Sequence, residues 1–174
     1  MSTIFEALEQ AGCTTYQFPK NIDSRIENYC NAMSVAVYEV PEPQDLGICP
    51  YNLLYILKYQ FVNTGMFEPS LPLSHGIILV RSGRFSDRPK EELEFSLWHE
   101  IGHLISGNPY DEKFSDNWAF DRLVELYGNE DIVHAIVRDW LFYQYEVNET
   151  TGKYKDVESG YEHRIKMIEK YLNH

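Results

Sequence analysis

The most informative stretch of the sequence is a short run with two histidines four residues apart. His99, Glu100 and His103 form the pattern H-E-x-x-H within "SLWHEIGHLISG" (96–107). On a helix, residues four apart lie on the same face, so both rings can direct a nitrogen at one metal ion. The intervening glutamate is placed to accept a proton from a water molecule at that ion. The pattern predicts hydrolytic zinc chemistry, although so short a pattern also occurs by chance on helices with surface histidines.

A third ligand decides between these interpretations, because catalytic zinc takes three protein ligands. Glu112 follows His103 by nine residues and lies four residues before Asp116 in "EKFSD". We predict that Glu112 is the third ligand and that Asp116 accepts a hydrogen bond from the other ring nitrogen of a ligand histidine. The alternative is that these acidic residues merely favour the start of a helix, where anions are stabilised. If the short spacer strained the geometry, Asp116 or, less favourably, Asp111 would replace Glu112 as the ligand.

Two helices are predicted to carry these residues. The first spans about 86–106, with Ser86 or Asp87 as its cap, and ends at Gly107. Apolar residues recur inside it at helical spacing and would bury it in a core; they are Leu93, Leu97, Trp98, Ile101, Leu104 and Ile105. The second spans about 111–127 and ends at Gly128. The link between the two is short and turn-rich, which lets one helix fold back on the other.

The remaining pattern predicts an α+β fold that is mostly helical with a short sheet. Helical periodicity marks residues 21–33, 130–145 and 159–172, and the polar stretch 148–159 predicts a loop. Runs rich in β-branched residues predict strands over 34–40 and 76–80, whereas residues 50–61 fit either a helix or a buried strand. We expect the strand over 76–80 to offer its edge to an extended substrate. The length predicts a single domain over residues 1–174.

Charge and composition argue against several classes of protein. The formal net charge of −12 would repel a phosphate backbone, so we expect no direct nucleic-acid binding. No apolar run is long enough to span a bilayer, and the N-terminus lacks the pattern of a signal peptide. The three cysteines are widely spaced and form no C-x-x-C pair, which favours reduced thiols and a cytoplasmic protein.

The two motifs in combination resemble those of the ImmA/IrrE-type zinc metallopeptidases. In that family an H-E-x-G-H helix follows a short strand and precedes a helix with the pattern E-x-x-A-[DNR]. Here Gly102 matches the family glycine, and Glu112 matches the third ligand. Trp118 and Ala119 match an aromatic-Ala pair of the second helix. Ser115 stands where the family usually has Ala, a form that thermolysin-like gluzincins share.

This resemblance covers about residues 74–125 and implies a small zincin-like domain in which the H-E-x-x-H helix packs against a second ligand helix. It also implies site-specific proteolysis of a regulator, commonly a transcriptional repressor, by proteins that phages or mobile elements often encode. The chain departs from the pattern in its short ligand spacer, only eight residues between His103 and Glu112. It also carries no recognisable helix-turn-helix or sensor sequence.

We therefore predict a zinc-dependent endopeptidase that hydrolyses a specific protein, with Glu100 as the catalytic base. A further group must stabilise the oxyanion of the intermediate. The candidates, in order, are His163 and Tyr161, then Tyr110, His134 and His75. One alternative is a non-catalytic module that keeps the fold and the zinc and only binds a partner. Another is a structural protein without metal.

Overall fold

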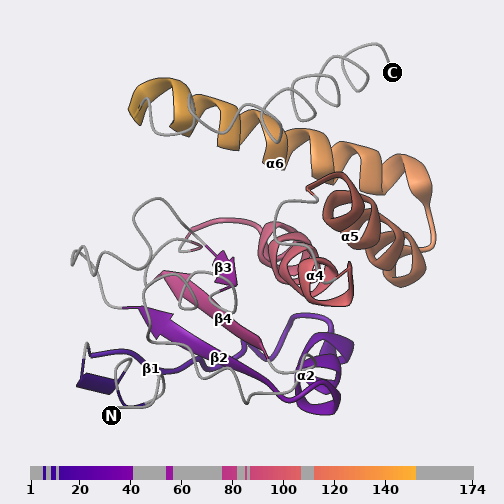
Figure 1. The fold of residues 1–174 in the computed structure, drawn as a ribbon. Helices are drawn as coiled ribbons and strands as arrows, with labels where there is room; N and C mark the ends of the chain where they lie inside the picture. Colours follow the sequence, from indigo (N-terminus) through magenta and orange to yellow (C-terminus); the bar gives the residue numbers. More distant parts are fainter. Residues whose placement is uncertain are drawn as a thin grey trace. The chain divides into compact units, whose positions relative to one another are not determined.

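The computed structural model describes residues 12–40, 54–56, 76–81, 87–106 and 112–151, together with the isolated residues 6, 9, 10 and 85. The side chains of residues 40, 54–56, 81, 112 and 141–151 lie outside this description. The chain divides into two compact units, residues 1–90 and 91–174, each of which is described by itself. The described part is a mixed α+β structure and mostly helical (Figure 1), in agreement with the sequence-based prediction.

The first unit holds a four-stranded sheet in the order β1-β2-β4-β3. The strands are β1 (Thr14–Thr15), β2 (Val35–Val40), β3 (Leu54–Ile56) and β4 (Gly76–Arg81). Strands β2 and β4 are parallel and pair along their whole length, whereas β1 and β3 pair antiparallel with β2 and β4 respectively. The strands predicted over 34–40 and 76–80 are therefore confirmed, and the described part of 50–61 is a strand.

The position of β4 contradicts the expectation that its edge receives a substrate. One side of β4 pairs with β2 from Gly76 to Arg81, and its other side pairs with β3 from Ile78 to Val80. The backbone groups of an internal strand are already used in its two ladders, so little of β4 remains for β-addition. The run of β-branched residues predicted the strand correctly, but such a run does not distinguish an edge strand from a central one.

Helix α2 (Ser24–Ala32) precedes β2 and confirms the helix predicted over 21–33. Asp23 is its N-cap, and the carboxylate accepts a hydrogen bond from the backbone N–H of Arg25 at 3.0 Å. Ile26 and Cys30 are fully buried on one face of the helix. The apolar side chains of β4 are buried too, so this unit has its own apolar core.

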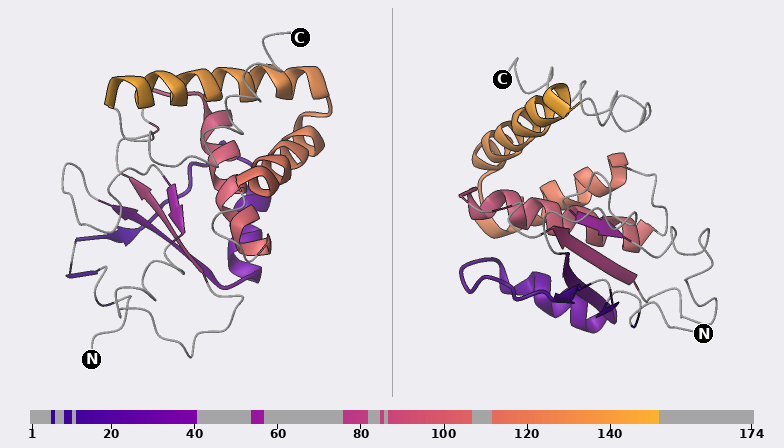
Figure 2. Two further views of the ribbon diagram at one scale, coloured as in Figure 1. Left: turned by 45° about the horizontal axis from the view of Figure 1, so that its top comes forward. Right: turned by 90° about the vertical axis from the view of Figure 1, so that its left-hand side faces the viewer.

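The second unit holds three helices: α4 (Lys90–Ser106), α5 (Glu112–Tyr127) and α6 (Glu130–Thr151). Gly128 adopts a left-handed conformation (φ 69°) and its N–H bonds to the carbonyl of Val124, which ends α5 as predicted. The side chain of Asn129 then caps α6 by accepting from the N–H of Asp131 at 2.8 Å. Because only two residues separate the helices, α5 and α6 meet at a sharp corner (Figure 2).

Two predictions about the C-terminal third need comment. Helix α6 continues to Thr151, so the loop predicted from 148 onward begins later than expected. Polar residues such as Asn148 and Thr150 suit a turn by composition, but a helix already formed extends at small cost per residue. The helix predicted over 159–172 lies outside the described residues. In the part of the chain that the structure covers, no helix combines the length and the apolar character needed to cross a bilayer.

Candidate metal centre

Helix α4 is buried along most of its length, including its two histidines. His99 is 5% exposed and His103 is 4% exposed, so neither is a surface histidine. They lie one turn apart on the helix, and Glu100 follows His99 at a half-buried position. Burying a polar ring is unfavourable unless its nitrogens are satisfied, so the surroundings of this pair decide what it does.

The two histidine rings face each other through the same kind of nitrogen. Nε2 of His103 lies 3.1 Å from Nε2 of His99, and the rings meet edge to face with centroids 4.7 Å apart. The free lone pairs of two neutral imidazoles would repel at this distance. Either one ring donates a proton to the other, or both nitrogens point at one cation.

Asp116 fixes the orientation of the first ring. Its Oδ1 lies 2.7 Å from Nδ1 of His99, and the aspartate is completely buried. The two atoms meet at ion-pair distance but not with the geometry of an aligned hydrogen bond. A carboxylate so close to Nδ1 favours a proton on that nitrogen, which would leave the lone pair of Nε2 on the side of His103. The sequence predicted a hydrogen bond from a ring nitrogen of a ligand histidine to Asp116; the structure brings the carboxylate oxygen beside Nδ1 of His99, and the hydrogen bond itself stays a prediction. The ligand roles assigned to the histidines remain predictions.

The geometry of the pair fits a zinc ion. Zinc–nitrogen bonds of about 2.0–2.1 Å in a tetrahedral site place two ligand nitrogens roughly 3.3 Å apart. The observed separation of 3.1 Å is close to this value. A carboxylate on the far nitrogen of a ligand histidine is also the usual support of such a ring, because it fixes the tautomer that can bind metal. Two of the three expected donors are therefore arranged as zinc would need them.

The third predicted donor, Glu112, is the first residue of α5 and lies one turn before Asp116. The side chain of Glu112 is outside the described ones. Among the described side chains, no group of three histidine, cysteine or acidic residues is arranged to hold a metal. Glu112 thus shares a helix with Asp116, and its ligand role stays a prediction.

The first half of α4 is fixed by polar contacts that sequence reasoning missed. Trp140 of α6 donates its indole N–H to Oγ of Ser96 at 3.2 Å, and its ring packs on Phe95. Tyr127 at the end of α5 donates to Oε1 of Glu94 at 2.5 Å. The only signal in the sequence was the presence of polar residues inside a predicted core helix, which does not identify their partners.

Most candidates for the oxyanion position cannot be placed. Tyr110, Tyr161, His163 and His75 lie outside the described residues. His134 is described: its Nε2 lies 3.5 Å from a carboxylate oxygen of Glu130, and its ring packs against Phe120. These contacts belong to the α5–α6 packing, so the structure gives no support to His134 as the oxyanion group.

Comparison of the chain with protein-family models, with curated proteins and with solved structures gives no significant match. The resemblance to a metallopeptidase family therefore rests on the two motifs and on the geometry of the residues they contain.

Proposed function

We propose that this protein is a zinc-dependent endopeptidase that hydrolyses a peptide bond in a specific protein. The observation that supports the proposal best is the convergence of His99 Nε2 and His103 Nε2 at 3.1 Å, with Asp116 held against the far side of His99. A buried pair of like nitrogens supported in this way is what a His₂ part of a zinc site requires. The zincin-like fold belongs to the same proposal.

In this proposal His99, His103 and Glu112 hold the ion. Zinc, when bound, lowers the pKa of a water molecule toward neutrality and polarises the scissile carbonyl. Glu100 follows the first ligand directly and is half-buried, so in this proposal its carboxylate would act on the water beside the ion. We assign it the proton transfers: it accepts the proton of the attacking water and then gives it to the leaving amine.

The oxyanion formed during attack needs a hydrogen-bond donor as well. We retain His163 and Tyr161 as the first candidates for this role and Tyr110 as the next, because a neutral tyrosine or a protonated histidine can donate to a developing negative charge.

The class of substrate is proposed from the resemblance alone. It indicates a transcriptional repressor or another regulator in the cytoplasm. The net charge of −12 supports a protein rather than a nucleic acid as the direct partner, because the chain would repel phosphates.

Replacing Glu100 by glutamine tests the proposal. Glu100→Gln keeps the size of the side chain and removes the base, so we expect it to retain zinc and to lose cleavage of a peptide library by roughly 10²–10⁴-fold. Glu91→Gln, on the first turn of the same helix, is the matched control and should cleave like the wild type. Equal cleavage by Glu100→Gln and wild type would refute the assigned base.

A second candidate is a structural protein without metal, which the 3.1 Å separation also permits. With the proton of His99 on Nδ1, the N–H of His103 could donate to Nε2 of His99 as an ordinary buried hydrogen bond. A non-catalytic module that only binds a partner differs from both, since it would keep zinc and show no cleavage with either variant. Metal content and cleavage together separate the three.

A further inference from the structure

Helices α4 and α5 approach each other most closely at Gly102. A Cβ atom added there would lie 3.0 Å from Cα of Ser115 and 3.2 Å from Cβ of Trp118. Carbon atoms in ordinary contact are about 3.5–4.0 Å apart. The nearest atom belongs to the backbone of α5, so no change of rotamer relieves the overlap. The two helices have this separation only because residue 102 has no side chain.

This close approach and the contact between Asp116 and His99 belong to the same helix crossing. His99 lies three residues before Gly102, about one turn earlier on α4, and Asp116 is the neighbour of Ser115 on α5. A change of helix separation at Gly102 and Ser115 therefore acts directly on the 2.7 Å distance between Asp116 and His99.

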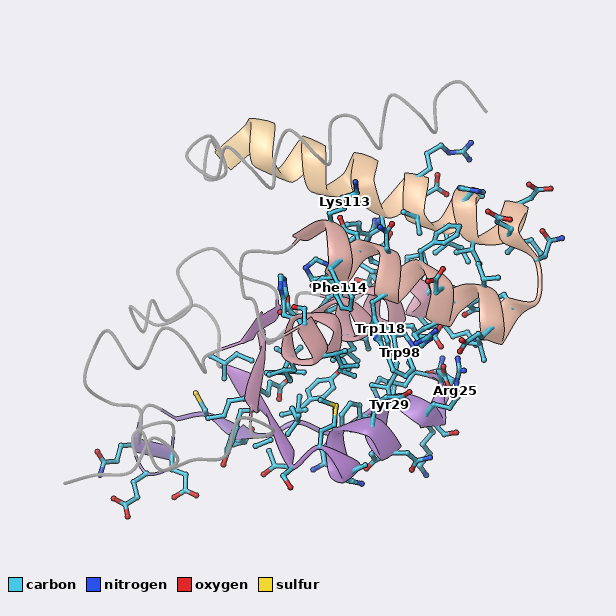
Figure 3. The ribbon with its side chains drawn as sticks, turned by 45° about the vertical axis from the view of Figure 1, so that its right-hand side comes forward. Arg25, Tyr29, Trp98, Lys113, Phe114 and Trp118 are labelled. Atoms are coloured by element: carbon cyan, nitrogen blue, oxygen red, sulfur yellow. The ribbon has the colours of Figure 1, made fainter. Side chains whose placement is uncertain are left out.

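The side of α5 that faces Gly102 has little room to yield. The ring of Trp118 stacks on Phe114 of the preceding turn, with centroids 6.3 Å apart and an interplanar angle of 16°. The guanidinium of Arg122, one turn later, lies 4.1 Å from the Trp118 centroid. Figure 3 labels Phe114 and Trp118 on α5. Ala119 and Leu123 are completely buried on the same helix, so a shift of α5 would disturb a packed core.

We propose that Gly102 is a positioning residue for the metal centre: its missing side chain sets the helix separation at which Asp116 reaches Nδ1 of His99. Accommodating a Cβ requires the helices to move apart by a few tenths of an ångström. The distance from His99 to Asp116 would then grow to about 3.0 Å or more, beyond the roughly 2.7–2.9 Å of a charge-assisted hydrogen bond. With the carboxylate less close, His99 can place its proton on Nε2 more often, and in that form the nitrogen cannot bind metal.

The inference rests on the proposed function only for its consequence for zinc. The position of the ring proton is a property of the metal-free protein and can be measured without any activity. The proposed function and the proposed role of Gly102 can therefore be refuted independently.

The tautomer of His99 in the metal-free protein is therefore the first test. Nitrogen-15 NMR of the histidine rings at pH 8 should find the proton of His99 on Nδ1 in the wild type and a larger share of it on Nε2 in Gly102→Ala. Leu123→Ala is the control, because it weakens the packing of α5 without adding an atom at the crossing, and it should keep the wild-type tautomer. A proton that stays on Nδ1 in Gly102→Ala overturns the inference.

A double-mutant cycle of zinc affinity shows whether Gly102 acts through Asp116. Loss of a carboxylate that supports a ligand histidine weakens metal binding by about 10–100-fold, and we expect Gly102→Ala to do the same in competition with a chelator. In the Asp116→Ala background, Gly102→Ala should cause no further loss. Equal losses in both backgrounds would show that Gly102 acts otherwise. If the wild type binds no zinc, the proposed function fails, and the tautomer measurement alone decides this inference.

Discussion

The two halves of helix α4 both bury polar side chains, but they satisfy them in different ways. In the first half, Tyr127 donates to Glu94, and Trp140 donates to Ser96. Each of these pairs joins a donor to an acceptor. In the second half, His99 and His103 meet through nitrogens of the same kind, 3.1 Å apart.

This difference separates a structural contact from a candidate site. A donor that meets an acceptor is satisfied, and removing either group leaves the other buried without its partner. Two like nitrogens need either a shared proton or a cation between them. Asp116 also lies 2.7 Å from Nδ1 of His99, where its charge favours a proton on that nitrogen, so the second half suits a ligand in a way that the first half does not.

The first prediction concerns the first half of α4 and is the largest change in stability that we expect. Trp140→Phe keeps an aromatic ring against Phe95 and removes the donor to Ser96. We expect it to lower the free energy of unfolding by about 1–3 kcal/mol, as for a broken buried hydrogen bond with some lost packing, and to leave the zinc content of the protein as in the wild type. Urea unfolding and metal analysis of the same samples measure both. Loss of zinc in this variant would show that the polar contacts in the first half of α4 also support the histidine pair in the second half.

The thiol of Cys30, in the unit of residues 1–90, is a further buried polar group, and we assign it no ligand or catalytic role. Burial, and then the nearby Glu27 carboxylate, raise the pKa of the Cys30 thiol from 9.0 to about 11. The folded protein therefore holds this proton more tightly than the unfolded chain does. The stability that results is fully present below pH 9 and is lost as the pH rises toward about 11.

We accordingly predict that the wild type loses more stability than Cys30→Ala when the pH is raised from 8 to 10.5. The expected difference is roughly 1–2 kcal/mol in the free energy of unfolding. Urea titrations at several pH values measure it. Parallel curves for the two proteins would show that Cys30 does not contribute to the pH dependence.

The smallest predicted effect concerns Ser115, whose completely buried hydroxyl has no hydrogen-bond partner among the residues that the structure describes. Ser115→Ala removes this unsatisfied oxygen and keeps the backbone that packs against Gly102. We expect the free energy of unfolding to rise by about 1 kcal/mol or less, because a buried hydroxyl without a partner is unfavourable. A loss of stability, seen as a lower melting temperature, would mean that the hydroxyl has a role that the structure does not describe.

Local patterns in the sequence predicted the two helices that carry the candidate site. The end of the second helix at Gly128 and the periodicity of the first helix depend on neighbouring residues, and the structure confirms them, although the first helix begins at Lys90 and not near residue 86. The contact of Asp116 with a histidine was predicted because its partners have a fixed helical spacing. The central position of β4 and the contacts of Trp140 and Tyr127 were not predictable, since they depend on which distant segments pack together.

The central claim is that His99, His103 and Glu112 hold one zinc ion, and metal content tests it most directly. The purified protein would be incubated with zinc, freed of the excess and analysed as wild type, Glu112→Ala and Lys113→Ala, the last being an exposed neighbour of the ligand. We predict about one zinc per chain in the wild type and in Lys113→Ala, and little in Glu112→Ala. No zinc in the wild type would contradict the claim and leave a hydrogen-bonded histidine pair on a buried helix. Full retention in Glu112→Ala would refute the assigned ligand set.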